Sequence, residues 1–442
     1  MGILGVLGHP RHPLVQLEGY LTAIPISEVA GPTGARLHTP FLERASEPGN
    51  RFRAHALGAF LTLRAIDRIA EDPGFLKSDL IVYQLRAAAN YLEELEPETN
   101  DTNYLREIVR VAQRVSVTSN RRLLWSPLLA FAYWLENELR LDESLDILET
   151  TLRLREGSQA REEIAAYLQQ GRVLRLSGRF VESRGAYEAG RGLAERHGDL
   201  RSAMVSRIGH AGIMQKTGDL PASERELRNV WALAQECGDE YVEARACHDL
   251  AVTMHEMGRP KEGVALAFRA FRLYEESVQR VRALLDTGTF LKQLGHYSAA
   301  KQAFSLGLDT NPNPEIRVNI VLELLELTFL VQDRVGFERC RRELEGVYDN
   351  LPAHESVDFE KKVGAGLAAF GSVREGKAHL RKGIELAEKY GLGQRVFELE
   401  ALLRELGDGQ APKTHTPEFQ HHDLDVDPGV RETIENLYAL SS

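Results

Sequence analysis

Glycine recurs at a nearly constant spacing between residues 178 and 371 of this 442-residue chain. Gly178, Gly218 and Gly258 are 40 residues apart, Gly295 follows after 37, and Gly371 follows after a further 76, close to two units of 38. Each glycine lies between two stretches whose apolar residues recur at helical spacing. A glycine there ends a helix cheaply, because it adopts the left-handed backbone conformation. The spacing therefore predicts a series of antiparallel helix pairs.

A single helix pair of this kind is not expected to be stable without neighbouring pairs. Two antiparallel helices cannot bury both of their apolar faces, whereas stacked pairs can, provided each pair repeats the same small and large residues at its contacts. The pair skipped between Gly295 and Gly371 is expected to turn near Gln332 and Asp333, and one more pair fits upstream around residues 139–142. The repeat array is predicted to cover residues 125–406.

The small and large residues of these units resemble the tetratricopeptide repeat. The best match is the unit around Gly295, and the poorest is the unit around Asp333, which has Leu325 and Phe337 where small residues belong. The matching residues of the best unit are Gly288, Leu291, Gly295, Tyr297, Ala300 and Phe304. The resemblance implies an all-α fold, a right-handed superhelical solenoid of antiparallel helix pairs. Units of 37–40 residues exceed the usual length and are similar to those of bacterial peptide-sensing regulators.

Three further regions flank the array. Residues 1–50 are rich in proline and glycine and are predicted to form an irregular leader. Residues 51–124 are expected to be helical, with Asp101 or Thr102 capping a third helix. Residues 407–442 are interpreted as a linker, an acidic tail with histidines and a short helix through Leu437, which either caps the solenoid or docks elsewhere.

Charge and cysteine content narrow the class of partner. The net charge is -11 and the isoelectric point is about 5.8, which argues against nucleic acid as a partner. The three cysteines form no CxxC pair and are expected to be buried packing thiols. We find neither a signal peptide nor a membrane-spanning stretch, so the sequence predicts a cytoplasmic protein without a membrane partner.

One stretch imitates a phosphate-binding loop. Gly371, Gly376 and Lys377 match the GxxxxGK spacing, but Ala378 stands where a Ser or Thr would bind magnesium. The loop also needs a preceding strand, and residues 363–370 fit a helix. We therefore interpret Gly371 as a turn glycine and Gly376 as a packing glycine.

The tail holds two weaker candidates for metal binding. Residues 423–429, followed by Glu435, resemble a calcium loop, but Pro428 occupies the glycine position and Glu435 comes one residue late. The histidines at 415, 421 and 422 lack an ordered spacing with other ligands. No nucleophile motif is present. The sequence thus predicts no catalytic residue, no cofactor and no metal, and a protein that is not an enzyme.

The resemblance also implies a binding surface. In tetratricopeptide proteins the first helix of each pair lines a concave groove, and the matching positions here are mostly basic or neutral. They are Arg172, Arg175, Lys216, Arg245, His248, His255, Arg282, Thr289, Lys292 and Gln293. Their basic side chains could pair with carboxylates or phosphates of a ligand, or they could be neutralised by neighbouring acids. The clamp for chaperone C-termini is not expected, because Gln169, Gly209 and Asp249 replace its asparagines.

Three functional hypotheses follow. The first is a non-enzymatic scaffold or adaptor that holds a partner protein or peptide, bearing acidic or phosphate groups, in a basic groove. The second is a peptide-responsive signalling or transcription regulator, although residues 1–120 offer no convincing helix-turn-helix as its effector. The third is a structural subunit that forms a homo-oligomer through the ends of the solenoid.

Overall fold

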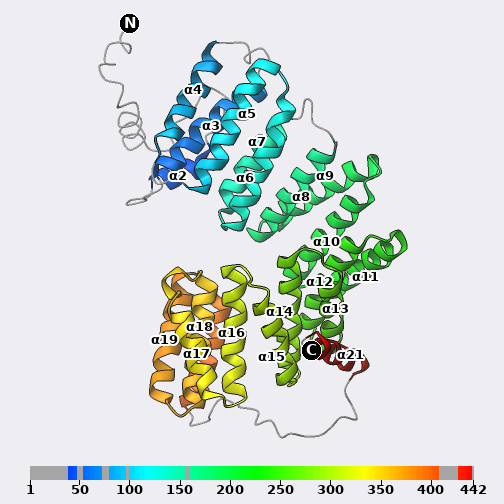
Figure 1. The fold of residues 1–442 in the computed structure, drawn as a ribbon, viewed down its shortest axis with the longest axis vertical. Helices are drawn as coiled ribbons and strands as arrows, with labels where there is room; N and C mark the ends of the chain where they lie inside the picture. The colour runs from blue at the N-terminus through cyan, green and yellow to red at the C-terminus, as the bar shows by residue number, and fades with distance from the viewer. Residues whose placement is uncertain are drawn as a thin grey trace. The chain divides into compact units, whose positions relative to one another are not determined.

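A computed structural model describes residues 38–46, 53–71, 79–95, 99–154, 160–407 and 427–440. Over these residues the protein is all helical, with twenty α-helices that follow one another in sequential antiparallel pairs (Figure 1). The chain divides into two compact units, Met1–Ile213 and Met214–Ser442, which we describe in turn.

The first unit holds the helices from α2 to most of α10. Their bounds are α2 (Thr39–Ser46), α3 (Arg53–Glu71), α4 (Asp79–Glu93), α5 (Asn100–Thr118), the 3₁₀ helix η3 (Arg121–Leu124), α6 (Trp125–Asn137), α7 (Leu141–Arg153), α8 (Ala160–Leu176), α9 (Phe180–Arg196) and α10 (Leu200–Lys216). Helix α2 lies inside the segment predicted to be irregular. Pro40 does not prevent it, because proline in the first turn of a helix removes no hydrogen bond. The cap of α5 is Thr99, whose hydroxyl oxygen accepts from the Thr102 amide, rather than the predicted Asp101 or Thr102.

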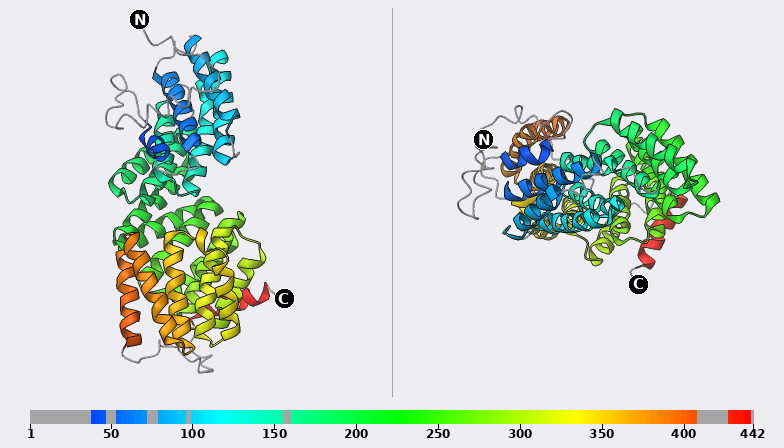
Figure 2. Two further views of the ribbon diagram at one scale, coloured as in Figure 1. Left: turned by 90° about the vertical axis from the view of Figure 1, so that its left-hand side faces the viewer. Right: turned by 90° about the horizontal axis from the view of Figure 1, so that it is seen from above.

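The second unit continues the series of pairs and ends on an isolated helix. Figure 2 shows its yellow and orange helices, α16 to α20, lying side by side. The bounds are α11 (Leu220–Cys237), α12 (Glu240–Glu256), α13 (Pro260–Leu273), α14 (Ser277–Gln293), α15 (Tyr297–Asp309), α16 (Pro314–Leu330), α17 (Arg334–Glu345), the 3₁₀ helix η4 (Tyr348–Asn350), α18 (Ala353–Ala369), α19 (Val373–Lys389), α20 (Gly393–Gly407) and α21 (Pro428–Ala439).

The turns lie where the glycine spacing predicts them. Gly295, between α14 and α15, has a φ of 84°, and the other four predicted glycines are also left-handed. A Cβ added at Gly295 would meet no atom within 4 Å, so its backbone conformation is what favours glycine there. The two pairs without a turn glycine place Leu139 and Gln332 at the same point, with φ of 57° and 58°.

Small residues let the two helices of a pair approach closely. A Cβ on Gly171 of α8 would lie 2.8 Å from the ring of Tyr187 in α9. Ser183 of α9 donates its hydroxyl to the carbonyl oxygen of Gly171 at 2.7 Å. Ser144 of α7 does the same to Ala132 of α6 at 2.8 Å. The tetratricopeptide pattern thus corresponds to real contacts between helices.

The phosphate-loop imitation belongs to this packing. Gly371 forms the turn after α18 with a φ of 91°, so a helix and not a strand precedes it. Gly376 lies in α19, where a Cβ would sit 2.6 Å from the carbonyl oxygen of Gly364. Both glycines therefore have the structural roles that the sequence predicted for them.

Helix α21 settles one open alternative, since it docks on α13 and α15 rather than on the last pair (Figure 1). Val430, Thr433 and Leu437 form its buried face. None of the described helices is both long enough and apolar enough to cross a membrane.

Candidate peptide-binding face

The ten predicted binding residues all lie on the first helices of their pairs. Arg172 and Arg175 are on α8 in the first unit, and Lys216 ends α10. In the second unit, α12 carries Arg245, His248 and His255, while α14 carries Arg282, Thr289, Lys292 and Gln293. We call the side of α12, α14, α16 and α18 that carries these and the matching positions the first-helix face of the second unit.

The first unit neutralises one of its two arginines. The Arg172 guanidinium forms an ion pair with Glu136 of α6, whose side chain is almost fully buried. Burial raises the pKa of Glu136, and Arg172 opposes that rise. Arg175 lies beside Gly212, where an added Cβ would come within 3.4 Å of its side chain, and its Nε is buried without a hydrogen-bond partner among the described residues. Gly212 thus leaves room for the arginine.

Helix α12 presents a mixed aromatic and polar surface. His248 Nε2 lies 2.8 Å from the carboxylate of Asp286 in α14, and its Nδ1 lies 3.3 Å from the hydroxyl of Tyr274. Burial alone would lower the pKa of His248, but the Asp286 carboxylate outweighs it and the pKa is raised. Arg245 lies over the ring of Tyr241, 5.7 Å from its centre. The Arg245 guanidinium and the His248 imidazole therefore lie about one helical turn apart on α12.

His255 occupies the end of the same helix and behaves differently. Its ring stacks on Phe290 of α14 at a centroid distance of 4.6 Å and an angle of 22°. The structure thus places this residue in an aromatic contact within the unit.

Helix α14 turns its polar residues toward carboxylates on α16. Lys292 donates to Glu323 at 2.7 Å and to Glu326 at 2.5 Å, and its side chain is only 9% exposed. Thr289 lies 3.4 Å from Glu323, while Arg282 makes an exposed contact of 3.5 Å with Glu315. Gln293 and Lys216 are exposed to solvent.

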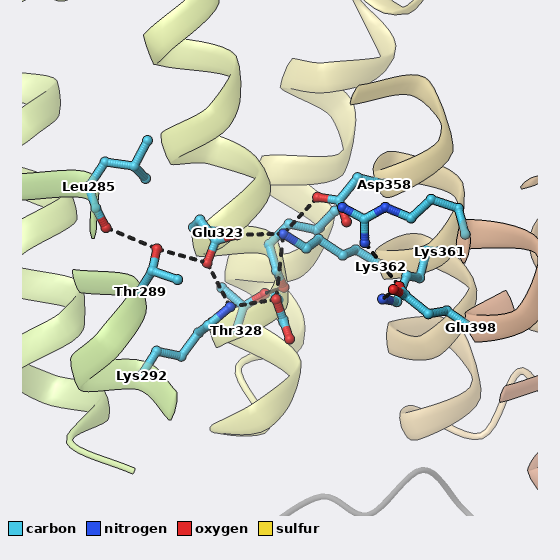
Figure 3. Close-up of polar contacts among 12 residues, drawn as sticks. Leu285, Thr289, Lys292, Glu323, Thr328, Asp358, Lys361, Lys362 and Glu398 are labelled. Carbon is cyan, nitrogen blue, oxygen red and sulfur yellow. Dashed lines mark hydrogen bonds and ion pairs between the residues drawn. The ribbon is translucent and has the colours of Figure 1, made fainter. Parts of the chain in front are cut away.

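The ion pairs continue onto α18 and form the most connected polar cluster of this face (Figure 3). Lys362 Nζ lies 2.7 Å from Glu323, 2.8 Å from Asp358 and 3.5 Å from Glu326, with 8% of its side chain exposed. We call Lys292, Glu323, Glu326, Lys362 and Asp358 the charge cluster. It joins three successive first helices, and Lys361 extends the pattern to Glu398 of α20 at 2.7 Å.

The charge cluster is held ionised by its own partners. Burial would raise the pKa of Glu323, but Lys362 and Lys292 outweigh it and lower the pKa to about 2. The three carboxylates raise the pKa of Lys362 above its ordinary range, against the opposing effect of burial. Three carboxylates face two ammonium groups, so the cluster carries one formal negative charge. Positive charge at Lys292 is thus fully matched within the unit.

Sequence reasoning missed the acidic half of this cluster. It stopped at α14, because the large residues Leu325 and Phe337 left the register of the next unit in doubt. The glutamates at 323 and 326 stand 39 and 36 residues before Lys362, about one repeat unit away. That spacing was a usable signal, since residues one unit apart on first helices face each other.

The other candidate sites lie partly outside the described residues. The histidines at 415, 421 and 422 and the aspartates at 423 and 425 are not described. Asp427 caps α21 by accepting from the amides of Gly429 and Val430. Among the described residues, no group of three or more His, Cys, Asp or Glu side chains is arranged to hold a metal ion.

The cysteine prediction was wrong at one position. Cys247 and Cys340 are buried, as expected, and burial raises the pKa of Cys247 to about 12. Cys237 is exposed, because it is the last residue of α11, where the buried stripe of the helix has ended.

These features define an all-helical protein built of tetratricopeptide-like helix pairs. Solved structures with a similar fold include a Rap protein complexed with competence and sporulation factor (11% identity, TM-score 0.43, 80% of this chain and 98% of that chain). A Rap conjugation gene regulator of plasmid pLS20 in complex with the Phr* peptide is also similar (11%, 0.49, 76% and 97%). So is PilF of Pseudomonas aeruginosa (13%, 0.38, 54% and 98%). No family model matches the chain, and no curated protein matches it in sequence.

Proposed function

We propose that the chain is a non-enzymatic binding module that holds a peptide or an extended protein segment against the first-helix face of its second unit. The observation that carries this proposal is the charge cluster. Buried ion pairs contribute little net stability compared with apolar packing, yet five charged residues occupy this face on three successive helices. A binding role gives such residues a function that packing alone does not.

An extended peptide needs hydrogen-bond partners along its whole length, because its own backbone groups are not paired. The cluster and the side chains beside it offer both donors and acceptors from α12 to α18. Donors outside the cluster include Arg245 and Gln293, while Asp286 and Glu323 are acceptors. The proposed ligand lies across the first helices and bonds to both kinds of group.

The ligand is proposed to carry carboxylate or phosphate groups toward one end of this face. Arg282 keeps 38% of its side chain exposed, and among the described residues its one ion pair is the long contact with Glu315. Arg245 is held by the ring and the hydroxyl of Tyr241 rather than by an ion pair with a carboxylate among the described residues. Two guanidinium groups are thus placed to pair with anions, and arginine binds such groups through two parallel hydrogen bonds. The opposite end of the face is neutral or acidic.

Purified full-length protein on an array of immobilised peptides of varied charge tests this proposal. Peptides with a central carboxylate or phosphate should retain the wild type and lose the Arg245→Glu/Arg282→Glu variant. The matched control is Arg225→Glu/Arg381→Glu, which reverses two exposed arginines on the second helices α11 and α19. Equal retention of both variants would contradict the proposed face.

A further inference from the structure

Helix α21 covers a part of the second unit that the first-helix face does not include. It packs on the second helices α13 and α15 through Val430, Thr433 and Leu437, one narrow stripe at helical spacing. Residues 408–426, which link it to α20, number nineteen. The chain therefore docks its own short amphipathic helix on α13 and α15 (Figure 1).

We call the surface of α11, α13 and α15 that α21 covers the seat, and α21 packs on it loosely. A pocket of about 480 Å³ remains between α21, α13 and Trp231 of α11. The pocket opens to solvent, and its lining atoms lack the contacts that a closely packed interface would give them. The wall formed by α11 and α13 is largely apolar, with Leu266, Phe268 and Leu273 beside Trp231. The α21 wall opposite has only Gly429, Glu432, Thr433 and Asn436.

The charges on the two walls are complementary. Arg269 and Arg272 line the pocket from α13, and Glu432 lines it from α21. Arg269 is already engaged, because it bonds to Glu243 at 2.5 Å and lies over the Trp231 ring. Arg272 is exposed and forms no ion pair within the described part of the chain. The seat thus favours a helix with acidic residues along one edge.

We propose that this pocket is a docking site for a short, acidic amphipathic helix of a partner protein, which replaces α21. Competition decides what that helix must contain. A tethered helix acts at an effective concentration on the order of 1 mM, so a free helix of equal quality does not displace it. The partner helix must therefore bind better than α21, and the empty volume shows how. A large apolar side chain in place of Asn436 or Thr433 fills the pocket against Leu266 and Phe268.

The high effective concentration of the chain's own α21 also disfavours a second copy of this chain as the occupant. Its α21 has the same small residues and gains nothing over the tethered helix. This proposal is independent of the proposed function, because α13 and α15 are second helices and none of the groups on the first-helix face takes part.

Fluorescence anisotropy with two labelled peptides of residues 427–440 tests the docking site on the full-length protein. One peptide has the natural sequence and the other carries Asn436→Leu. The natural peptide should bind at least tenfold more tightly to the Val430→Glu/Leu437→Glu chain, whose own helix is released, than to the wild type. The Asn436→Leu peptide should bind the wild type at least tenfold more tightly than the natural peptide, which needs no change in the protein.

Further arms separate the outcomes. Arg272→Glu, added to the released chain, should weaken both peptides, whereas Arg245→Glu/Arg282→Glu on the first-helix face should change neither. Equal affinity of the two peptides for the wild type, or no binding of either peptide to the released chain, would overturn the docking site. Dimers that form in the wild type and vanish in Val430→Glu/Leu437→Glu would assign the seat to a second copy and overturn the partner helix.

Discussion

The pairs α14–α15 and α16–α17 lie next to each other in the sequence, but they differ in where the small residue that contacts a large ring lies. In α14–α15 the first helix has Gly288, and Phe304 of the second helix covers it. In α16–α17 the matching small positions hold Leu325 and Phe337, both fully buried. The space that Phe337 needs comes from the following pair, because a Cβ on Gly366 of α18 would collide with its ring.

These two pairs share a close contact between a large ring and a small residue, although different residues make it. A close approach requires one small partner for each large ring, and that partner can lie in the same pair or in the next one. Moving it to the next pair joins α17 to α18, where Phe337 also meets Phe370 at a centroid distance of 5.3 Å. The deviating pair is therefore bound to its neighbour, and its first helix carries the acidic half of the charge cluster.

The largest effect is expected from removing the displaced ring. Phe337→Ala should destabilise the second unit by roughly 3–5 kcal/mol, because it leaves a cavity between α17 and α18. Urea unfolding followed by circular dichroism measures this change. Gly366→Ala should lower the free energy of unfolding by about 1–3 kcal/mol in the wild type, because the added methyl group overpacks the contact with Phe337. In the Phe337→Ala chain the same substitution should lower it much less. Additive costs of the two substitutions would show that the small partner of Phe337 is not Gly366.

Lys362→Met should lower the free energy of unfolding by about 3 kcal/mol. It leaves the carboxylates of Glu323, Glu326 and Asp358 without the ammonium group that they share. Adding Glu323→Gln should recover part of that stability, since it removes one of the uncompensated charges. The same unfolding measurement applies, and Lys361→Met is the matched control, because Lys361 is more exposed and pairs with Glu398, which lies outside the cluster. Equal losses for the two lysines would contradict the central place of Lys362.

A pH dependence should distinguish the two pairs as well. The pKa of Glu323 is lowered from its ordinary 4.5 to about 2. Its contribution to stability is therefore complete above about pH 4.5 and is lost as the pH falls toward 2, because the unfolded chain takes up the proton first. Glu323→Gln should flatten the unfolding free energy across this window. An unchanged slope between pH 4.5 and 2 would place the acid sensitivity elsewhere.

The smallest effect concerns the two turns. Gly295 turns α14 into α15 with a φ of 84°, whereas Gln332 makes the equivalent turn with a φ of 58°. Gln332→Gly should stabilise the protein by roughly 0.5 kcal/mol, because relief of the left-handed strain exceeds the entropy cost of glycine. Gly295→Ala should destabilise by about 1 kcal/mol. Thermal unfolding resolves both, and a loss of stability in Gln332→Gly would mean that the side-chain bond from Gln332 to the Phe329 carbonyl outweighs the strain.

Much of the fold was predictable because its signals are local. A turn glycine and the small residues seven positions before it report on one helix pair, so Gly288 and Gly295 were interpreted correctly from the sequence. The partnership of Phe337 with Gly366 was not predictable, because it joins two pairs that the pattern treats as separate. The binding-face residues were placed on their helices, but the pairing of Lys292 with Glu323 required knowing how neighbouring first helices face each other.

The proposed function requires that a ligand anion binds Arg245 and Arg282 on the first-helix face. The most direct test is a charge exchange between Arg282 and the peptide that the array selects. Titration should show Arg282→Glu weakening that peptide at least tenfold, and a peptide with the matching acid changed to lysine should regain affinity for Arg282→Glu alone. Unchanged affinity in Arg282→Glu, or no recovery with any lysine-substituted peptide, would contradict the claim.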